Sequence, residues 1–436
     1  MTKSIIFTAL MVNSLMLCGQ NLKMTFTANG ASAVVDSVKA TNLSNNESIT
    51  LPGYDTLILS YNTSGISHTS INQLLTVYPN PFMGKTQIVA NFLKAQTISL
   101  QVFNLTGQSV VRTQAIVQSG SNYFDLNLAK AGVYIISLYS EQYTESIKVL
   151  CSESSGNENQ IKYCGPSQSS GNAKLKTMNI YTLSYTDGDI ILYRCRGGVH
   201  ITIITDSPVS STNYEVGFAP CIDPDGKSYA IVKIGTQTWM AENLAWLPSV
   251  SVSSKGSDTL KYYYVYETED SVVSRAKNAE NYKKYGVLYN WPAAINMSSE
   301  RLLTTPMMQG GCPTGWHLPD DDEWKMLEMT LGMDQADTDS LYWRNSGEVG
   351  HKLKSSVNWS GNGNGSNQSG FSSLPGGYRN THGGFQSLNE YAVFWTSSQS
   401  DNMLWYRSIY FENKGVYRIK TMPGHGFSVR CVKDGL

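Results

Sequence analysis

The sequence has 436 residues, with 33 basic and 34 acidic side chains and a formal net charge of −1. This length allows roughly three domains, and the balanced charge gives no electrostatic basis for binding nucleic acid. Charged residues are sparse at 15%, whereas 26 tyrosines, 9 tryptophans and 37 glycines favour a mainly β protein with many turns.

Residues 1–19 have the layout of a secretory signal peptide, with a positive charge at Lys3 and an apolar stretch that ends at Leu17. The stretch is roughly fourteen residues long and a bilayer span needs about twenty, so we expect cleavage and no transmembrane segment. The alternative is lipidation of Cys18, although Leu17 stands where a small residue is expected.

Six cysteines follow the signal segment, and none of them forms a CxxC pair. An even number in an oxidising compartment favours disulfides over metal sites. The six are Cys151, Cys164, Cys195, Cys221, Cys312 and Cys431.

Residues 20–62 are expected to form a short β segment, because apolar and polar side chains alternate around Val34–Val38 and Leu57–Leu59. The polar stretch 61–73 is typical of a linker. Over 74–150, strand-like runs recur every ten to fifteen residues or so with turn signals between them, which predicts a β-sandwich.

Three segments inside 74–150 carry a family resemblance. VYPNPFMGKTQIV, VFNLTGQSVV and AGVYIISLYSEQYTESIKVL resemble, in this order, the C-terminal sorting domain of type IX secretion substrates. The resemblance implies contact with the type IX secretion machinery and a secreted or cell-surface location. In that family the domain is usually terminal, whereas residues 151–436 follow it here, so a role as a plain β-sandwich spacer is the alternative.

Local signals within this region predict details. The prolines of YPNPF keep Tyr78–Phe82 extended and out of a central strand, which predicts entry at a sheet edge. Asn104–Gly107 is typical of a hairpin turn.

Residues 151–173 are rich in Ser, Gly and Asn without periodicity, which predicts a linker that a Cys151–Cys164 bond would close into a loop. Residues 174–217 alternate again, with a hairpin turn expected at Asp187-Gly188. We expect this β segment to pair with the strands of 20–62, with the sandwich inserted between them.

The C-terminal module, 218–436, begins with a different pattern. Asp223–Gly226 is too short for an EF-hand loop and favours a hairpin turn. A strand over 229–234, a turn at Gly235 and a return through 238–240 follow.

The stretch CPTGWHLPDDDEW, 312–324, places a cysteine, a histidine and four acids close together. Asp320 and Glu323 fit a capping box, in which each side chain accepts the other residue's backbone N–H. The acids between them suit the positive end of the helix dipole. Every acid therefore has a helix-start explanation; we expect no metal here, and His317 is interpreted as a structural or surface group.

Cys312 then needs a partner, and we expect it to pair with Cys431 in the closing strand GFSVRCVKD. The bond would close a loop of roughly 120 residues and stabilise the fold by about 4–5 kcal/mol in the chain-entropy model.

Six motifs in 221–434 carry a second resemblance: KIGTQTWMAENL, YGVLYNWPAA, GGCPTGWHLPDDDEWKML, GFSSLPGGYRN, YAVFWTSSQ and HGFSVRCVKD. Together they resemble the Fibrobacter succinogenes major paralogous domain of secreted bacterial proteins. The resemblance implies a C-type-lectin-like α+β fold, which the formylglycine-generating enzymes share.

Catalysis is not expected. A formylglycine-generating type of enzyme needs a reactive cysteine pair that holds copper, and two of the three cysteines in this module are better used in a disulfide. No Gly-x-Ser-x-Gly, HExxH or phosphate-binding glycine loop occurs. The Glu-Pro-Asn and Trp-Asn-Asp strings of calcium-dependent lectins are missing too. Sugar binding by that chemistry is therefore not expected, calcium-free recognition stays open, and no cofactor is expected.

Recognition by surface aromatics is the favoured function, because 359–417 is rich in Tyr, Trp, Ser, Gly and Asn with single arginines. Alternation in WYRSIYF places about half of these side chains in the core. The predicted binding residues are Arg379, Tyr391, Trp395, Tyr406, Arg407 and Tyr410. The sequence thus predicts an exported, non-catalytic protein that binds an unknown glycan or protein, with a purely structural cell-surface role as the alternative.

Overall fold

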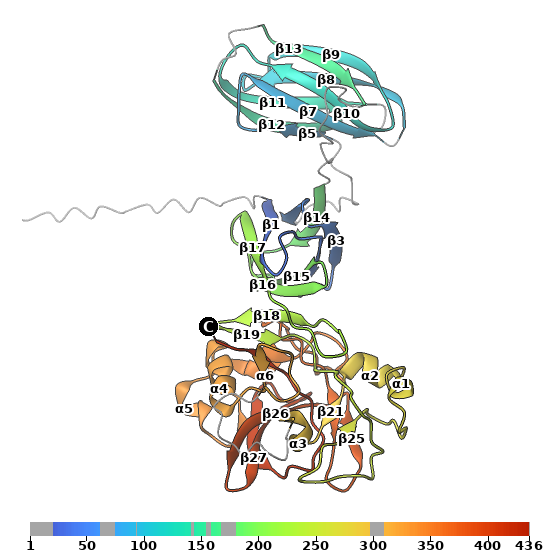
Figure 1. The fold of residues 1–436 in the computed structure, drawn as a ribbon. Helices are drawn as coiled ribbons and strands as arrows, with labels where there is room; N and C mark the ends of the chain where they lie inside the picture. The colour runs from blue at the N-terminus through green and yellow to red at the C-terminus, as the bar shows by residue number, and fades with distance from the viewer. Residues whose placement is uncertain are drawn as a thin grey trace, which may run out of the picture. The chain divides into compact units, whose positions relative to one another are not determined.

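The computed structural model of the chain describes residues 21–61, 75–92, 94–140, 144–153, 158–166, 180–296 and 309–435, and is mainly β (Figure 1). The chain forms two compact units, Ser64–Lys176 and the remainder. The expected signal peptide, Cys18 and residues 62–73 of the expected linker lie outside the described ranges. Within these ranges, none of the helices has the length and apolar character needed to cross a membrane.

Unit Ser64–Lys176 is a β-sandwich, as predicted. Its sheets have the strand orders β13-β10-β7-β5 and β6-β12-β11-β8-β9, and alternate side chains such as Ile88, Leu100, Phe124 and Ile136 fill the core between them. The strands are β5 (Leu75–Tyr78), β6 (Phe82–Met83), β7 (Lys85–Phe92), β8 (Gln96–Asn104), β9 (Ser109–Val117), β10 (Gly120–Asn127), β11 (Gly132–Tyr139), β12 (Thr144–Glu153) and β13 (Gln160–Gly165).

The turn signals of the sandwich are confirmed. Gly107 N donates to Asn104 O at 3.0 Å and closes the β8–β9 hairpin. YPNPF lies between β5 and β6, which are edge strands of the two different sheets, because a proline cannot complete a central ladder.

The prediction of a linker over 151–173 is wrong for its described part. β12 continues to Glu153, and β13 pairs with β10 along the edge of the four-stranded sheet. Cys151 and Cys164 are both free thiols, so no bond between them closes a loop. The many Ser, Gly and Asn residues around β13 concealed a strand that is only six residues long.

The second unit begins with strands that come from both sides of the insertion. β1 pairs with β17, β2 with β15, and β4 with β14, which confirms the predicted pairing of 20–62 with 174–217. The strands are β1 (Leu22–Gly30), β2 (Ser37–Asn42), β3 (Ser48–Pro52), β4 (Thr56–Tyr61), β14 (Ile180–Tyr185), β15 (Ile191–Gly197), β16 (His200–Asp206) and β17 (Thr212–Phe218).

Asp187-Gly188 forms a turn but not a hairpin. Asp189 N donates to Thr186 O at 2.9 Å, yet β14 and β15 belong to different sheets. The turn therefore carries the chain from one sheet to the other, which local sequence cannot distinguish from a hairpin connection.

An eight-stranded sheet, β22-β29-β19-β18-β16-β15-β2-β3, continues from this segment into the C-terminal module. β16 pairs with β18 (Ala230–Ile234), which returns through β19 (Gln237–Met240) as predicted. The chain ends beside these strands (Figure 1), where β29 (Val432–Lys433) pairs with β19 and with β22 (Trp316–His317).

The second sheet of the module has the order β23-β28-β27-β26-β24-β25. Its strands are β23 (Tyr342–Arg344), β24 (Gly376–Arg379), β25 (Phe385–Leu388), β26 (Tyr391–Ser400), β27 (Met403–Tyr410) and β28 (Val416–Thr421), and a separate pair is β20 (Tyr263–Tyr264) with β21 (Leu288–Tyr289). The helices are α1 (Val273–Ala276), α2 (Glu280–Tyr285), α3 (Trp291–Ala294), α4 (Asp321–Thr330), α5 (Gln335–Thr338), η1 (Ser346–Glu348) and α6 (Val349–Leu353).

Buried cations hold the long irregular segments of this module. Arg430 donates to the carbonyls of Met240, Phe371 and Ser372, and Arg379 donates to those of Ser253, Lys255, Asn380 and Gly424. Lys354 donates to the carbonyls of Tyr410, Phe411 and Asn413. Each cation thus satisfies several backbone acceptors at once, most of them outside the strands and helices.

Candidate functional site

The acidic run after Pro319 begins a helix, as predicted. Asp320 Oδ1 accepts from Glu323 N at 2.8 Å and Glu323 Oε2 accepts from Asp320 N at 2.9 Å, which completes the capping box of α4. Trp324 and Leu327 are fully buried on the following turns. These residues position one face of the six-stranded sheet, because they pack against Phe394 and Ile409.

The sequence did not reveal the role of Asp321 and Glu328, which form a buried ion-pair network behind the sheet. Asp321 lies 2.7 Å from Arg407 and 2.6 Å from Arg418, and Glu328 lies 2.7 Å from Arg344 and 2.8 Å from Arg407. Burial raises the pKa of Asp321, but the hydrogen bonds and charges of Arg418 and Arg407 outweigh it and hold that pKa well below its usual range. Asp321 therefore stays ionised, and the ion pairs give both carboxylates a structural role.

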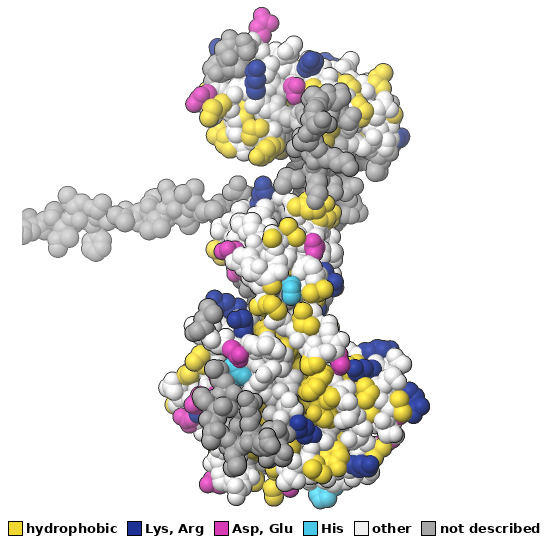
Figure 2. Space-filling model, in the orientation of Figure 1, with side chains coloured by type: hydrophobic (Ala, Val, Ile, Leu, Met, Phe, Trp, Pro, Cys, Tyr) yellow, Lys and Arg dark blue, Asp and Glu magenta, His cyan; other side chains and the backbone are white. Residues whose placement is uncertain are grey.

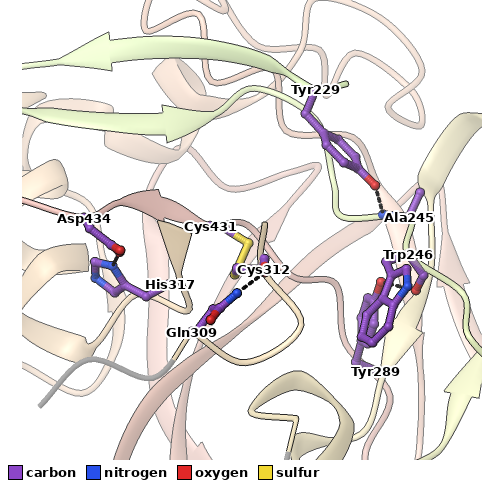
Figure 3. The surroundings of a disulfide bond; sticks show 9 residues. All are labelled: Tyr229, Ala245, Trp246, Tyr289, Gln309, Cys312, His317, Cys431 and Asp434. Carbon is purple, nitrogen blue, oxygen red and sulfur yellow. Dashed lines mark hydrogen bonds and ion pairs between the residues drawn. A yellow bond between two sulfur atoms is a disulfide. The ribbon is translucent and has the colours of Figure 1, made fainter. Parts of the chain in front are cut away.

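His317 is buried in β22, where its ring faces Asp434 (Figure 3) on one side and Glu323 on the other. Its Nε2 lies 2.8 Å from Glu323 Oε1 and its Nδ1 lies 2.7 Å from Asp434 Oδ1. Burial lowers the pKa of His317, but the hydrogen bonds and charges of the two carboxylates together raise it above the ordinary value. Within the described ranges, no group of three or more His, Cys, Asp or Glu side chains is arranged to hold a metal ion.

The disulfide between Cys312 and Cys431 forms as predicted, with 119 residues of sequence separation (Figure 3). The other cysteine of the module, Cys221, is a free, fully buried thiol. Cys195 is also buried, which raises its pKa to about 12 and leaves the thiol protonated. These buried thiols lack the low pKa that a reactive cysteine needs.

Half of the predicted binding residues are in the core. Arg379, Trp395 and Arg407 are at most 1% exposed, so the expectation that they are exposed binding anchors is wrong. Arg379 donates its hydrogen bonds to backbone carbonyls, and Arg407 donates to the carboxylates of Asp321 and Glu328. Trp395 lies under Phe427 with ring centroids 4.3 Å apart, and its Nε1 donates to Tyr289 O.

Tyr406 and Tyr410 share one face, as the alternation of WYRSIYF predicted, and the pairing of β26 with β27 adds Tyr391 to it. Cross-strand pairs place Tyr391 opposite Tyr410, and Tyr406 opposite Trp395, on β26 and β27. All three tyrosines are half-buried. The rings of Tyr391 and Tyr410 stack with centroids 4.4 Å apart.

A groove of about 460 Å³ lies on this face, within the range of roughly 300–1,000 Å³ that is usual for small-ligand sites. We call it the aromatic groove. It is lined by Trp343, Tyr378, Ser387, Tyr391, Val393, Tyr406, Ser408, Tyr417, Thr421, His425 and Phe427.

Ring contacts join the two ends of the aromatic groove. The centroid of Tyr417 lies 5.0 Å from that of Trp343 and 6.4 Å from that of Tyr406, and Tyr406 lies 5.1 Å from Phe427. Phe427 is 3% exposed and forms the floor, whereas the other three rings are half-buried walls. Their positions are fixed by the strands, so the site is largely preformed.

Several of these wall residues could not be predicted from the sequence. Trp343 and Phe427 lie outside the aromatic-rich stretch 359–417, and no local pattern places them beside Tyr406. The alternation of β28 does contain a usable signal, because it sets Tyr417 on the face opposite to Arg418.

Comparison with known families gives two matches. Residues 232–433 match the Fibrobacter succinogenes major domain, and residues 76–152 match the secretion system C-terminal sorting domain. No curated protein matches the sequence significantly. The two matches support both family resemblances, and the match to the sorting domain indicates that the protein is secreted or located at the cell surface.

Proposed function

We propose that the protein is an exported, non-catalytic binding protein whose C-terminal module holds an extracellular ligand in the aromatic groove. The observation that carries the proposal is the groove itself, in which half-buried Trp343, Tyr406 and Tyr417 stand over a buried floor. Aromatic side chains give large contact area at a low cost in conformational entropy. A merely structural sheet face would have these rings covered.

The lack of a catalytic role is part of the proposal. The buried carboxylates Asp321 and Glu328 form ion pairs with arginines on the face of the sheet opposite to the groove. A general acid or base must reach its substrate, and these two groups are in the core. Figure 2 adds that, on the face in view, charged side chains stand singly or in small groups rather than in one patch of a single sign.

Two finer assignments belong to the same proposal. Export through the type IX machinery is supported by the sorting-domain match and by the intact sandwich of 75–166. A C-type-lectin-like fold for 218–436 is supported by the short helices, the long irregular segments and the disulfide to the closing strand.

The test is a screen of the full-length protein on glycan and protein arrays, beside a Tyr417→Ala variant and a Tyr342→Ala control. Tyr342 is an exposed aromatic next to the groove but not part of its lining. We expect at least one binder that Tyr417→Ala loses and Tyr342→Ala keeps. If neither array gives a binder at micromolar concentration, the structural cell-surface role replaces this proposal.

A further inference from the structure

The described lining of the aromatic groove contains no Lys, Arg, Asp or Glu side chain. Burial lowers the pKa of His425, and burial raises the pKa values of Tyr378, Tyr391, Tyr406 and Tyr417. The imidazole is therefore neutral and the phenols keep their protons near neutral pH. A charged ligand would lose its hydration here without gaining a counter-charge.

The groove nevertheless offers both donors and acceptors. Within the described part of the chain, no hydrogen bond occupies the hydroxyls of Tyr391, Tyr406, Tyr417 or Ser408. His425 Nδ1 lies 3.3 Å from Met422 O, and a proton on Nδ1 for that bond leaves Nε2 as an acceptor. Hydroxyl groups can donate and accept, so this set suits a ligand that does both.

The walls add the apolar half of the recognition. Tyr406 and Tyr417 are neighbouring half-buried rings whose faces carry partial negative charge. The C–H groups of a sugar ring carry a matching partial positive charge on one flat side, while its hydroxyls point outward. Aromatic faces and uncharged hydroxyls together therefore match the two parts of a sugar surface.

We propose that the ligand of the aromatic groove is a neutral oligosaccharide. A sugar ring lies with its C–H side against Tyr406 and Tyr417, and its hydroxyls bond to the tyrosine and serine hydroxyls and to His425. This inference rests on the proposed function and adds the ligand class. Binding in this mode needs no calcium.

The test is calorimetric titration of the full-length protein with three probes: short neutral hexose oligosaccharides, short uronic-acid oligosaccharides and a proline-rich peptide. The titrations are repeated at low and high salt with a chelator present. We expect binding of a neutral oligosaccharide that salt and chelator do not change, because no ionic contact is screened. Tyr417→Ala should weaken it about tenfold or more and Tyr406→Phe roughly threefold to tenfold, whereas Tyr342→Ala should leave it unchanged.

Other outcomes distinguish a failure of the ligand class from a failure of the proposed binding function. Binding of the peptide or the acidic sugar alone, weakened by Tyr417→Ala, overturns the ligand class and keeps the aromatic groove as a site. Binding that Tyr417→Ala does not weaken overturns both. Tyr406→Phe keeps the ring and its packing, so a loss of affinity in that variant cannot come from misfolding alone. Absence of any binding also overturns both.

Discussion

The two faces of the six-stranded sheet use the same strands for opposite purposes. On one face, Arg407 and Arg418 lie opposite each other on β27 and β28 and are neutralised by acids of α4. On the other face, Ser408 and Tyr417 lie opposite each other in an uncharged groove. Neighbouring residues of a strand point to opposite faces of the sheet. Arg407 therefore lies in the charged interior, whereas the next residue, Ser408, lies in the uncharged groove.

The comparison also shows that residue type alone does not mark a binding surface. Arginine and tryptophan are enriched at interfaces, yet in this module Arg379, Trp395 and Arg407 hold the core together. Tyr406 lies on the same face of the sheet as Trp395 and on the face opposite to Arg407, and only the tyrosine stays half-buried. The role of each side chain depends on what covers it. Residues of α4 cover Arg407, and Phe427 covers Trp395.

The largest expected effect comes from a change that reaches both faces. Cys431 lies in the segment that supplies Phe427 to the groove and Val432 to the core behind the sheet. Replacing both Cys312 and Cys431 by serine should lower the free energy of unfolding of this module by about 5 kcal/mol. Calorimetric unfolding of the full-length protein measures it, and an unchanged transition would contradict the assigned role of the disulfide.

The substitutions Arg407→Met and Tyr406→Phe, at adjacent positions, compare how much each face of the sheet contributes to the free energy of unfolding. Removing the guanidinium leaves Asp321 and Glu328 each with one fewer buried cation, so we expect a loss of about 3 kcal/mol. Tyr406→Phe should stay within about 0.5 kcal/mol of the unchanged protein, because its hydroxyl faces a groove. Urea unfolding followed by tryptophan fluorescence measures both; equal losses would mean that the faces do not differ.

Lys354→Met tests the buried cation at the end of β27. The carbonyls of Phe411 and Asn413 would lose their side-chain donor, whereas that of Tyr410 keeps Asn413 N, and we expect a loss of about 2 kcal/mol. Burial lowers the pKa of Lys354 to about 8, so the side chain is still mainly protonated at neutral pH. A matched Lys414→Met change removes an exposed ion pair with Glu348 and should cost far less.

The smallest expected effect concerns pH and His317. Its pKa is raised in the folded protein, so its contribution to stability is fully present below the unfolded value of about 6.5 and is lost as pH rises through the folded value. His317→Gln should remove this part of the pH dependence. Thermal unfolding from about pH 6 to about pH 9 checks it, and the same slope in both proteins would contradict the interpretation.

The features that could be predicted from the sequence are mainly those that depend on residues close together along the chain. The capping box at Asp320 and the alternation of β27 follow from spacing alone, whereas the Cys312–Cys431 pair is a choice that spacing does not determine. The burial of Arg407 could not be foreseen, because it depends on acids of a helix 79 residues away along the chain. The aromatic groove likewise depends on Trp343 and Phe427, which only the assembled sheet brings to Tyr406.

The aromatic groove is tested most directly by a crystal structure of the protein grown with the oligosaccharide that binds best. We expect ligand density against the rings of Tyr406 and Tyr417, with ligand hydroxyls within hydrogen-bond distance of their phenol oxygens. Ligand density on another surface, or a groove filled by the protein's own side chains, would contradict it.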